Sequence, residues 1–172
     1  MQNVCIFSPD RQYRYILRHT WEPLFEPRIC TWIGLNPSIA SETRLDKTLT
    51  RIRNFCSTWG CNGFIMTNLF ALVSTEPRLL YTTADPVGPD NDRYILEASQ
   101  ETQTVFAAWG VHGIYQNRAQ IVFKLIKRFN PLCLKETADR FPIHPLYVPA
   151  KTDPIPYLGP RQPQESRDEP AA

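Results

Sequence analysis

Apolar residues in this chain follow two alternating patterns. Continuous apolar runs, typical of strands buried on both faces of a sheet, occupy 29–35, 63–70 and 104–109. Apolar residues spaced three or four positions apart, as in amphipathic helices, occupy 45–59, 90–101 and 121–129. A short apolar run at 132–134 follows the last helix, and 13–21 has the pattern of a partly exposed strand near the sheet edge. The chain therefore alternates between predicted strands and predicted helices.

This order predicts an α/β fold, because strands separated by helices pair in parallel and carry the helices on both faces. We expect a three-layer sandwich with a central, mainly parallel four-stranded sheet. The 172 residues suit one domain, which we place at 1–158. The remainder, 159–172, combines proline, glutamine and mixed charge without a large apolar residue, so we expect it to be disordered.

Composition narrows the possible partners. The 19 basic and 17 acidic residues give a net charge of +2, so nucleic-acid binding would depend on local clusters. No apolar run approaches the ~20 residues that a bilayer requires, and the start of the sequence lacks a signal pattern. We therefore expect a cytoplasmic protein with no membrane partner. The five cysteines lack metal-ligand spacing, which predicts free thiols and neither a metal nor another cofactor.

Polar residues follow the central runs directly. Asn36 comes after the first run, Asn68 lies within the second, and Gly110 with His112 follows the third. His144 stands in a proline-bracketed loop after the last strand. Because the carboxyl ends of parallel strands meet at one edge of the sheet, we expect these residues to lie together there.

The two asparagines allow structural and functional interpretations. Asn36 precedes a proline, so it is either a turn residue or an amide that holds a water or a substrate edge. Asn68 requires a partner, because burying an unpaired amide costs ~1 to 3 kcal/mol. That partner is either another protein group or the hydrogen-bonding edge of a nucleobase.

The other candidates are individually weaker. Gly110 permits close approach of the backbone to a ligand, and His144 is either a rigidly held imidazole or an ordinary surface histidine. A local cluster of basic residues is either a solvated helix face or a phosphate contact; its members are Arg44, Lys47, Arg51 and Arg53. Ser38 either caps the segment that follows it or contacts DNA.

Several short strings in this order resemble the uracil-DNA glycosylase superfamily. They are GLNPS after a buried strand, the strand containing Asn68, VFAAWGVHG before a helix, and HPL in a late loop. Over about residues 12–150 the chain also resembles a bacterial and phage family of unknown function, through NPS, DKT, NLFAL, DPVGPDND and AAWGVHG. Three residues depart from the glycosylase pattern: Ser38 stands where glycine is usual, and Leu146 and Tyr147 replace small residues.

The resemblance implies specific roles for these residues. Asn36 would orient the water that attacks the sugar, and His144 would act beside the base or clamp the strand. Asn68 would read the edge of a pyrimidine, and it would share the base-binding site with Leu35 and Phe70. The implied DNA contacts are Ser38, Arg44, Lys47, Arg51, Gly110 and His112. No four-cysteine pattern is present, so the iron-sulfur branches of the superfamily are excluded.

We therefore expect a monomeric, monofunctional DNA glycosylase that flips a pyrimidine-type base out of DNA and hydrolyses its N-glycosidic bond. The base would be uracil, a mismatched base or a hypermodified cytosine of phage DNA, and the role would be repair or antiphage defence. Two alternatives stay open: a nucleic-acid- or nucleotide-binding module without catalysis, and a hydrolase of free nucleosides or nucleotides.

Overall fold

A computed structural model describes residues 2–21, 28–38, 45–76 and 78–161, and within them the strands form one sheet of seven. The strands are β1 (Gln2–Phe7), β2 (Arg14–Thr20), β3 (Ile29–Gly34), β4 (Gly63–Asn68), β5 (Val105–Ala107), β6 (Leu132–Cys133) and β7 (Ile155–Pro156). Their spatial order is β1-β2-β4-β3-β5-β6-β7. The four in the middle, β4, β3, β5 and β6, run parallel, whereas β1, β2 and β7 pair antiparallel.

The predicted α/β class is confirmed, but the predicted count of four strands is too small. The four apolar runs are the parallel strands, as expected. The predicted strand at 13–21 corresponds to β2, which lies inside the sheet because β1 covers its edge. β1 itself gave no sequence signal, since Val4 and Ile6 of this edge strand are exposed. β7 has only two residues, too few to show a pattern.

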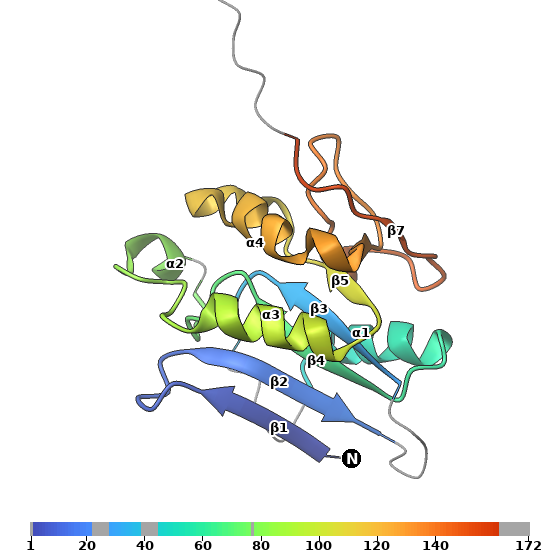
Figure 1. The fold of residues 1–172 in the computed structure, drawn as a ribbon, viewed down its shortest axis with the longest axis horizontal. Helices are drawn as coiled ribbons and strands as arrows, with labels where there is room; N and C mark the ends of the chain where they lie inside the picture. Colours follow the sequence, from blue (N-terminus) through green and yellow to red (C-terminus); the bar gives the residue numbers. More distant parts are fainter. Residues whose placement is uncertain (1, 22–27, 39–44, 77, 162–172) are drawn as a thin grey trace, which may run out of the picture.

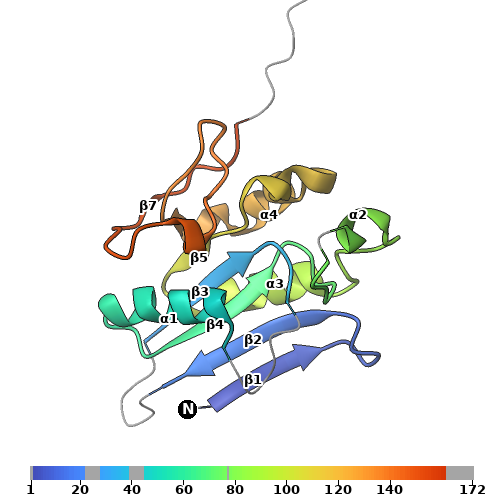
Figure 2. The ribbon, with the colours of Figure 1, turned by 180° about the vertical axis from the view of Figure 1, so that it is seen from behind.

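The helices make two layers, one on each face of the sheet. They are α1 (Lys47–Thr58), α2 (Leu79–Thr82), α3 (Asn91–Glu101) and α4 (Arg118–Ile126), with short 3-10 helices η1 (Val111–Asn117), η2 (Lys127–Phe129) and η3 (Pro145–Tyr147). α3 and α4 cover the face turned to the viewer in Figure 1, and α1 covers the face seen in Figure 2. On the α1 face, Ile52 and Phe55 pack with Trp32; on the other face, Ile95 and Val122 pack with Ile33.

β2 carries a bulge that decides which way one charged residue points. Opposite β1 the register passes from Ile6 paired with Ile16 to Phe7 paired with Arg14, so Tyr15 is an extra residue. Tyr15 and Ile16 consequently belong to the same hydrophobic cluster on the α3 face. A bulge of this kind reverses the normal alternation of side chains, so Arg14 is turned to the α1 face.

Two further features concern the described residues as a whole. No helix among them combines the length and the apolar character that a membrane crossing requires. The five cysteines are free thiols, with Cys30 and Cys56 in contact at 3.2 Å between their sulfur atoms.

Candidate active site

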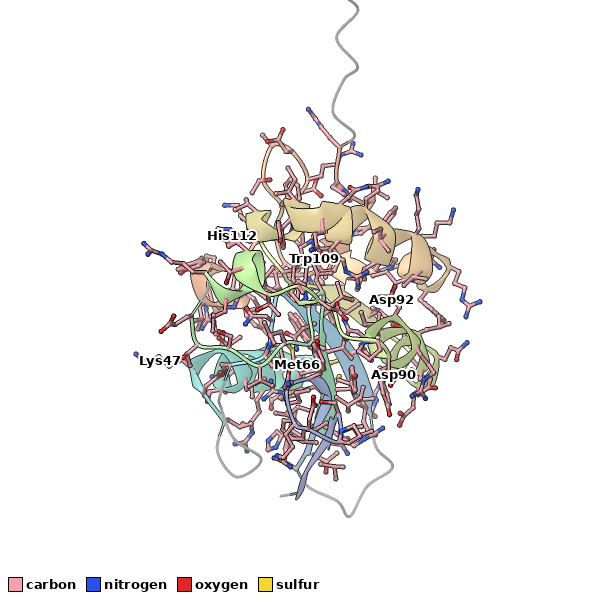
Figure 3. The ribbon with its side chains drawn as sticks, turned by 90° about the vertical axis from the view of Figure 1, so that its left-hand side faces the viewer. Lys47, Met66, Asp90, Asp92, Trp109 and His112 are labelled. Atoms are coloured by element: carbon pink, nitrogen blue, oxygen red, sulfur yellow. The ribbon has the colours of Figure 1, made fainter. Side chains whose placement is uncertain are left out.

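A pocket of about 650 Å³ lies at the carboxyl edge of the parallel strands. The chain leaves β3 toward β4 on one side and leaves β5 toward β6 on the other, so the direction of winding switches between β3 and β5. Open α/β sheets bind ligands in the crevice at such a switch point. The lining includes Gly34 at the end of β3 with Leu35 after it, and Trp109 with Gly110 after β5. Figure 3 looks onto this edge of the molecule, with Trp109 and Met66 near the centre of the view.

The pocket contains Asn68, the last residue of β4. Its side chain is 1% exposed, and neither Oδ1 nor Nδ2 has a hydrogen-bond partner among the described residues. Asn68 is in register with Gly34 of β3, and a Cβ on Gly34 would lie 2.8 Å from Asn68 Oδ1. Glycine at position 34 therefore leaves the space that the amide occupies. The Met66 methyl group, 2.5 Å from the same point, lies beside the amide.

Asn36 lines the pocket with its amide held in one orientation. Its Nδ2 donates to the carbonyl of Ser74 at 3.1 Å and to that of Pro37 at 3.3 Å. Two carbonyl acceptors fix which end of the amide is nitrogen, so Oδ1 is the atom that can accept a hydrogen bond from a water or a ligand. The structure thus combines the two interpretations of Asn36, because a turn contact orients the amide.

His144 lines the pocket from the loop that leads into η3, the short helix that packs near α1. Its Nδ1 accepts from the backbone N–H of Leu146 at 3.3 Å, which assigns the proton of the neutral ring to Nε2. Burial lowers the pKa of His144 below its ordinary value, and the nearby Asp46 carboxylate partly opposes that shift. At neutral pH the ring is therefore an uncharged donor through Nε2.

Ser38 and Asp46 connect the loop after β3 to the start of α1. Asp46 caps the helix by accepting from the Leu49 N–H at 2.8 Å, and its other oxygen accepts from the Ser38 hydroxyl at 2.8 Å. Both side chains also line the pocket. Ser38 therefore lies in the predicted site, where its hydroxyl serves the helix cap.

Gly110 and His112 form part of the opposite wall. Gly110 has φ +72°, which favours glycine, and a Cβ added there would meet nothing within 4 Å. His112 is exposed, and its Nδ1 lies 3.1 Å from the Tyr81 hydroxyl. Tyr147, which is 81% exposed, also lines the pocket, and its ring centre lies 5.8 Å from that of His144.

The remaining predicted residues divide between the pocket and the rest of the molecule. Leu35 lines the pocket, but Phe70 does not: β4 ends at Asn68, and the Phe70 side chain is fully buried against Tyr115 on the other face. Lys47 is exposed at the start of α1, on the side of the molecule seen in Figure 3. Arg44 lies outside the described residues, as does 162–172 of the predicted tail.

Arg51 and Arg53 both contact other parts of the protein. Arg51 donates to the carbonyl of Val148 and lies over the Phe55 ring, 5.0 Å from its centre. Arg53 lies over the Trp21 ring at 5.4 Å. Both side chains are half-buried and lie against protein groups, whereas Lys47 is exposed.

Arg14 is a charged lining residue that the sequence did not indicate. It is 4% exposed, and its Nη1 lies 3.4 Å from the carbonyl oxygen of Ser38. In the string YRYIL, strict alternation would place Arg14 on the opposite face from Leu17. The bulge at Tyr15 brings both to the same face, and no sequence signal marked that bulge.

The pocket therefore brings together two amides, a neutral imidazole and a buried guanidinium, all able to hydrogen-bond a polar ligand. Within the described ranges, no three or more His, Cys, Asp or Glu side chains are arranged to hold a metal ion. A model for the family described as "Protein of unknown function (DUF1643)" matches residues 14–146. No curated protein and no solved structure matches the chain.

Proposed function

The chain belongs to this family of unknown function, and from the geometry of its pocket we propose that it is a DNA glycosylase acting on a pyrimidine-type base. The fold would then be that of the uracil-DNA glycosylase superfamily, which the sequence strings resemble. Asn68 is the observation on which the proposal depends.

A pyrimidine is the ligand that suits the Asn68 amide. The two polar atoms of this buried amide lack partners among the described residues, which destabilises the fold. Such a group calls for an explanation, and a ligand that pairs with it would supply one. The pyrimidine edge presents a donor beside an acceptor, which pairs with Oδ1 and Nδ2 of one asparagine. Because Asn68 is covered, the base reaches it only when a neighbour moves. Met66 is suited to this, since its unbranched thioether adapts readily.

Asn36 and His144 would then act on the two ends of the bond that breaks. The electrons of the C1′–N bond leave with the base, and the sugar acquires oxocarbenium character. The water that adds to C1′ donates a hydrogen bond to Asn36 Oδ1 and loses a proton to bulk water as the new C–O bond forms, and the departing base anion takes up one proton from bulk water. His144 donates from Nε2 to the oxygen of the departing base, whose negative charge it stabilises. A donor aimed at developing charge typically contributes about 10² to 10³ in rate.

Access to the base requires that it leave the helix, because neither its edge nor C1′ is reachable inside the stack. Side chains at the rim suit a nucleic-acid surface: Lys47 is exposed for phosphate contact, and Tyr147 offers an aromatic face. The base itself is uracil, a mismatched base or a hypermodified cytosine of phage DNA. The first two choices imply repair, and the third implies antiphage defence.

The test is excision under single-turnover conditions from duplexes containing each of these bases, with abasic sites as the readout. Asn36→Ala should slow excision by about 10² to 10³ while DNA affinity is nearly unchanged. The matched control is Asn62→Ala. Asn62 also bonds a backbone group, the Arg28 N–H at 2.7 Å, but it precedes β4 at the opposite end of the sheet.

Each outcome of this experiment distinguishes the proposal from its alternatives. Excision that Asn36→Ala abolishes and Asn62→Ala leaves unchanged supports a glycosylase. Binding of DNA without abasic sites indicates a binding module. Release of bases from free nucleosides, with intact DNA left untouched, indicates a nucleoside hydrolase. Either of the last two results refutes the proposed function.

A further inference from the structure

Arg14 is a buried cation that the proposed chemistry does not use. It is 4% exposed and lines the same pocket as Asn68. Burial lowers the pKa of its guanidinium from the ordinary value, although charge at Cys5 and Asp46 opposes the shift. A charge is kept in such a place only when the surrounding groups or a ligand compensate it.

The way in which the chain positions Arg14 is specific. The extra residue Tyr15 in β2 reverses the side-chain alternation, and without it Arg14 would face α3. Bulges occur next to active sites, where they redirect a side chain. Here the bulge lies one residue from Arg14, and the redirected group enters the pocket at the switch point of the sheet.

The acidic residue of the pocket lining, Asp46, makes two hydrogen bonds within the protein. Its two oxygens accept from the Leu49 N–H and from the Ser38 hydroxyl, each at 2.8 Å. The start of α1 further stabilises this carboxylate through the helix dipole. The charge of Asp46 also acts on Arg14, so the protein itself compensates part of this buried charge.

The size of the pocket favours a ligand larger than a bare base. The volume of about 650 Å³ lies within the range of roughly 300–1,000 Å³ found for drug-sized ligands. A single six-membered ring is smaller than such a ligand. The pocket therefore has room for a group attached to the base or to its sugar.

We propose that Arg14 binds an anionic oxygen group of the ligand, so that the pocket selects a pyrimidine carrying a carboxylate or a phosphate. The planar guanidinium matches both groups through paired N–H donors. This inference rests on the proposed function, because it takes the ligand to be a pyrimidine. The anionic group comes either from a substituent on the base or from the nucleotide phosphate.

Binding of small probes separates these two sources. Uracil-5-carboxylate tests the substituent, uridine 5′-monophosphate tests the phosphate, and uracil and uridine are the uncharged references. In NMR titrations, Arg14→Met should weaken binding of one charged probe by about ten- to a hundredfold, the range for a charge-assisted hydrogen bond. Binding of the uncharged reference should stay within about twofold. Arg14→Lys should lie between the two, because lysine supplies charge without the fork.

The matched control is Arg18→Met on the same strand, which removes a guanidinium paired with Glu101 outside the pocket. A second NMR measurement needs no variant: in the unsubstituted protein, the charged probe should shift the Arg14 Nε–H signal. If Arg14→Lys and Arg14→Met weaken charged and uncharged probes equally, Arg14 only supports the loop at Ser38, and the inference is overturned. An unshifted Nε–H signal at saturation also overturns it.

Failure of this inference differs from failure of the proposed function. If the protein excises bases from DNA, but the Arg14 variants bind charged and uncharged probes equally well, the Arg14 inference alone is overturned. Arg14-dependent binding of a charged probe without any excision supports the Arg14 inference and refutes the glycosylase.

Discussion

Replacing Asn68 by leucine should make the protein more stable and destroy its base recognition. Leucine branches at the same carbon as asparagine and has no polar atoms, although it is larger. Asn68 Oδ1 and Nδ2 are buried without a hydrogen-bond partner in the described part of the chain, and an unsatisfied buried group costs about 1–3 kcal/mol. Removing both gains about 2–6 kcal/mol, from which fitting the larger leucine takes about 1–3 kcal/mol, so the free energy of unfolding should rise by about 1–3 kcal/mol. At roughly 2–4 °C per kcal/mol for a protein of this size, Tm should rise by roughly 2–12 °C.

The same change should act on the ligand in the opposite direction. A leucine facing the pyrimidine edge leaves a donor and an acceptor of the base unpaired in a dry pocket, at about 1–3 kcal/mol each. Since about 1.4 kcal/mol corresponds to a factor of ten, base binding or excision should fall by about 10² to 10⁴. A residue that weakens the fold and is needed by the ligand is typical of a functional site.

Asn91 provides the matched control for this prediction. It is a second fully buried asparagine, but its Nδ2 donates to the carbonyls of Asn68 and Leu69, each at 3.0 Å. Asn91 Oδ1 also lacks a partner among the described residues, but losing two hydrogen bonds outweighs removing one unpaired atom, so Asn91→Leu should lower the free energy of unfolding by about 1–3 kcal/mol. Urea unfolding of both variants measures whether each change raises or lowers the free energy of unfolding. If Asn68→Leu also unfolds more easily than the parent, Asn68 already has a partner in the free protein, and the reasoning is refuted.

Two other predictions concern charge. Lys47→Gln should flatten the salt dependence of DNA binding by about one unit of slope, whereas Arg51→Gln should leave the slope unchanged and lower stability by about 1–3 kcal/mol, because Arg51 bonds Val148; a lower slope with Arg51→Gln at parental stability would contradict the structure. The pKa of His144 is lower in the folded protein than in the unfolded chain, so the unfolded chain binds a proton more readily. The free energy of unfolding should therefore keep its full value above pH ~6.5 and decrease as the pH falls below it. His144→Gln should reduce that loss in urea unfolding at pH 7.5 and 5.5, and His112→Gln, which alters an exposed histidine of the same rim, is the control. If the parent and His144→Gln lose the same free energy of unfolding between pH 7.5 and 5.5, another group causes the pH dependence.

Much of the site's position follows from the sequence alone. Continuous apolar runs separated by amphipathic helices require parallel strands, and parallel strands connected in the right-handed sense end at one edge. Asn36, Asn68, Gly110 and His144 could therefore be placed together from their positions just after the strands. These inferences use local periodicity and a general rule of handedness, both of which can be read from the sequence.

Other features depended on contacts between residues far apart in the chain. The pairing of β1 with β2 rests on backbone hydrogen bonds of an edge strand whose side chains are partly exposed, so it left no apolar pattern. The resemblance implied that Phe70 lies in the base-binding site, but β4 ends at Asn68 and its alternation of faces ends there too.

Charged side chains show the same division between sequence and tertiary structure. Lys47 and Arg51 belong to one basic helix, yet Lys47 is exposed and Arg51 bonds a carbonyl 97 residues further along the chain. Arg14 enters the pocket because one extra residue in β2 turns it from one face of the sheet to the other. Sequence periodicity determined which residues form each element, whereas the registers, bulges and long-range contacts that aim individual side chains exist only once the sheet is assembled.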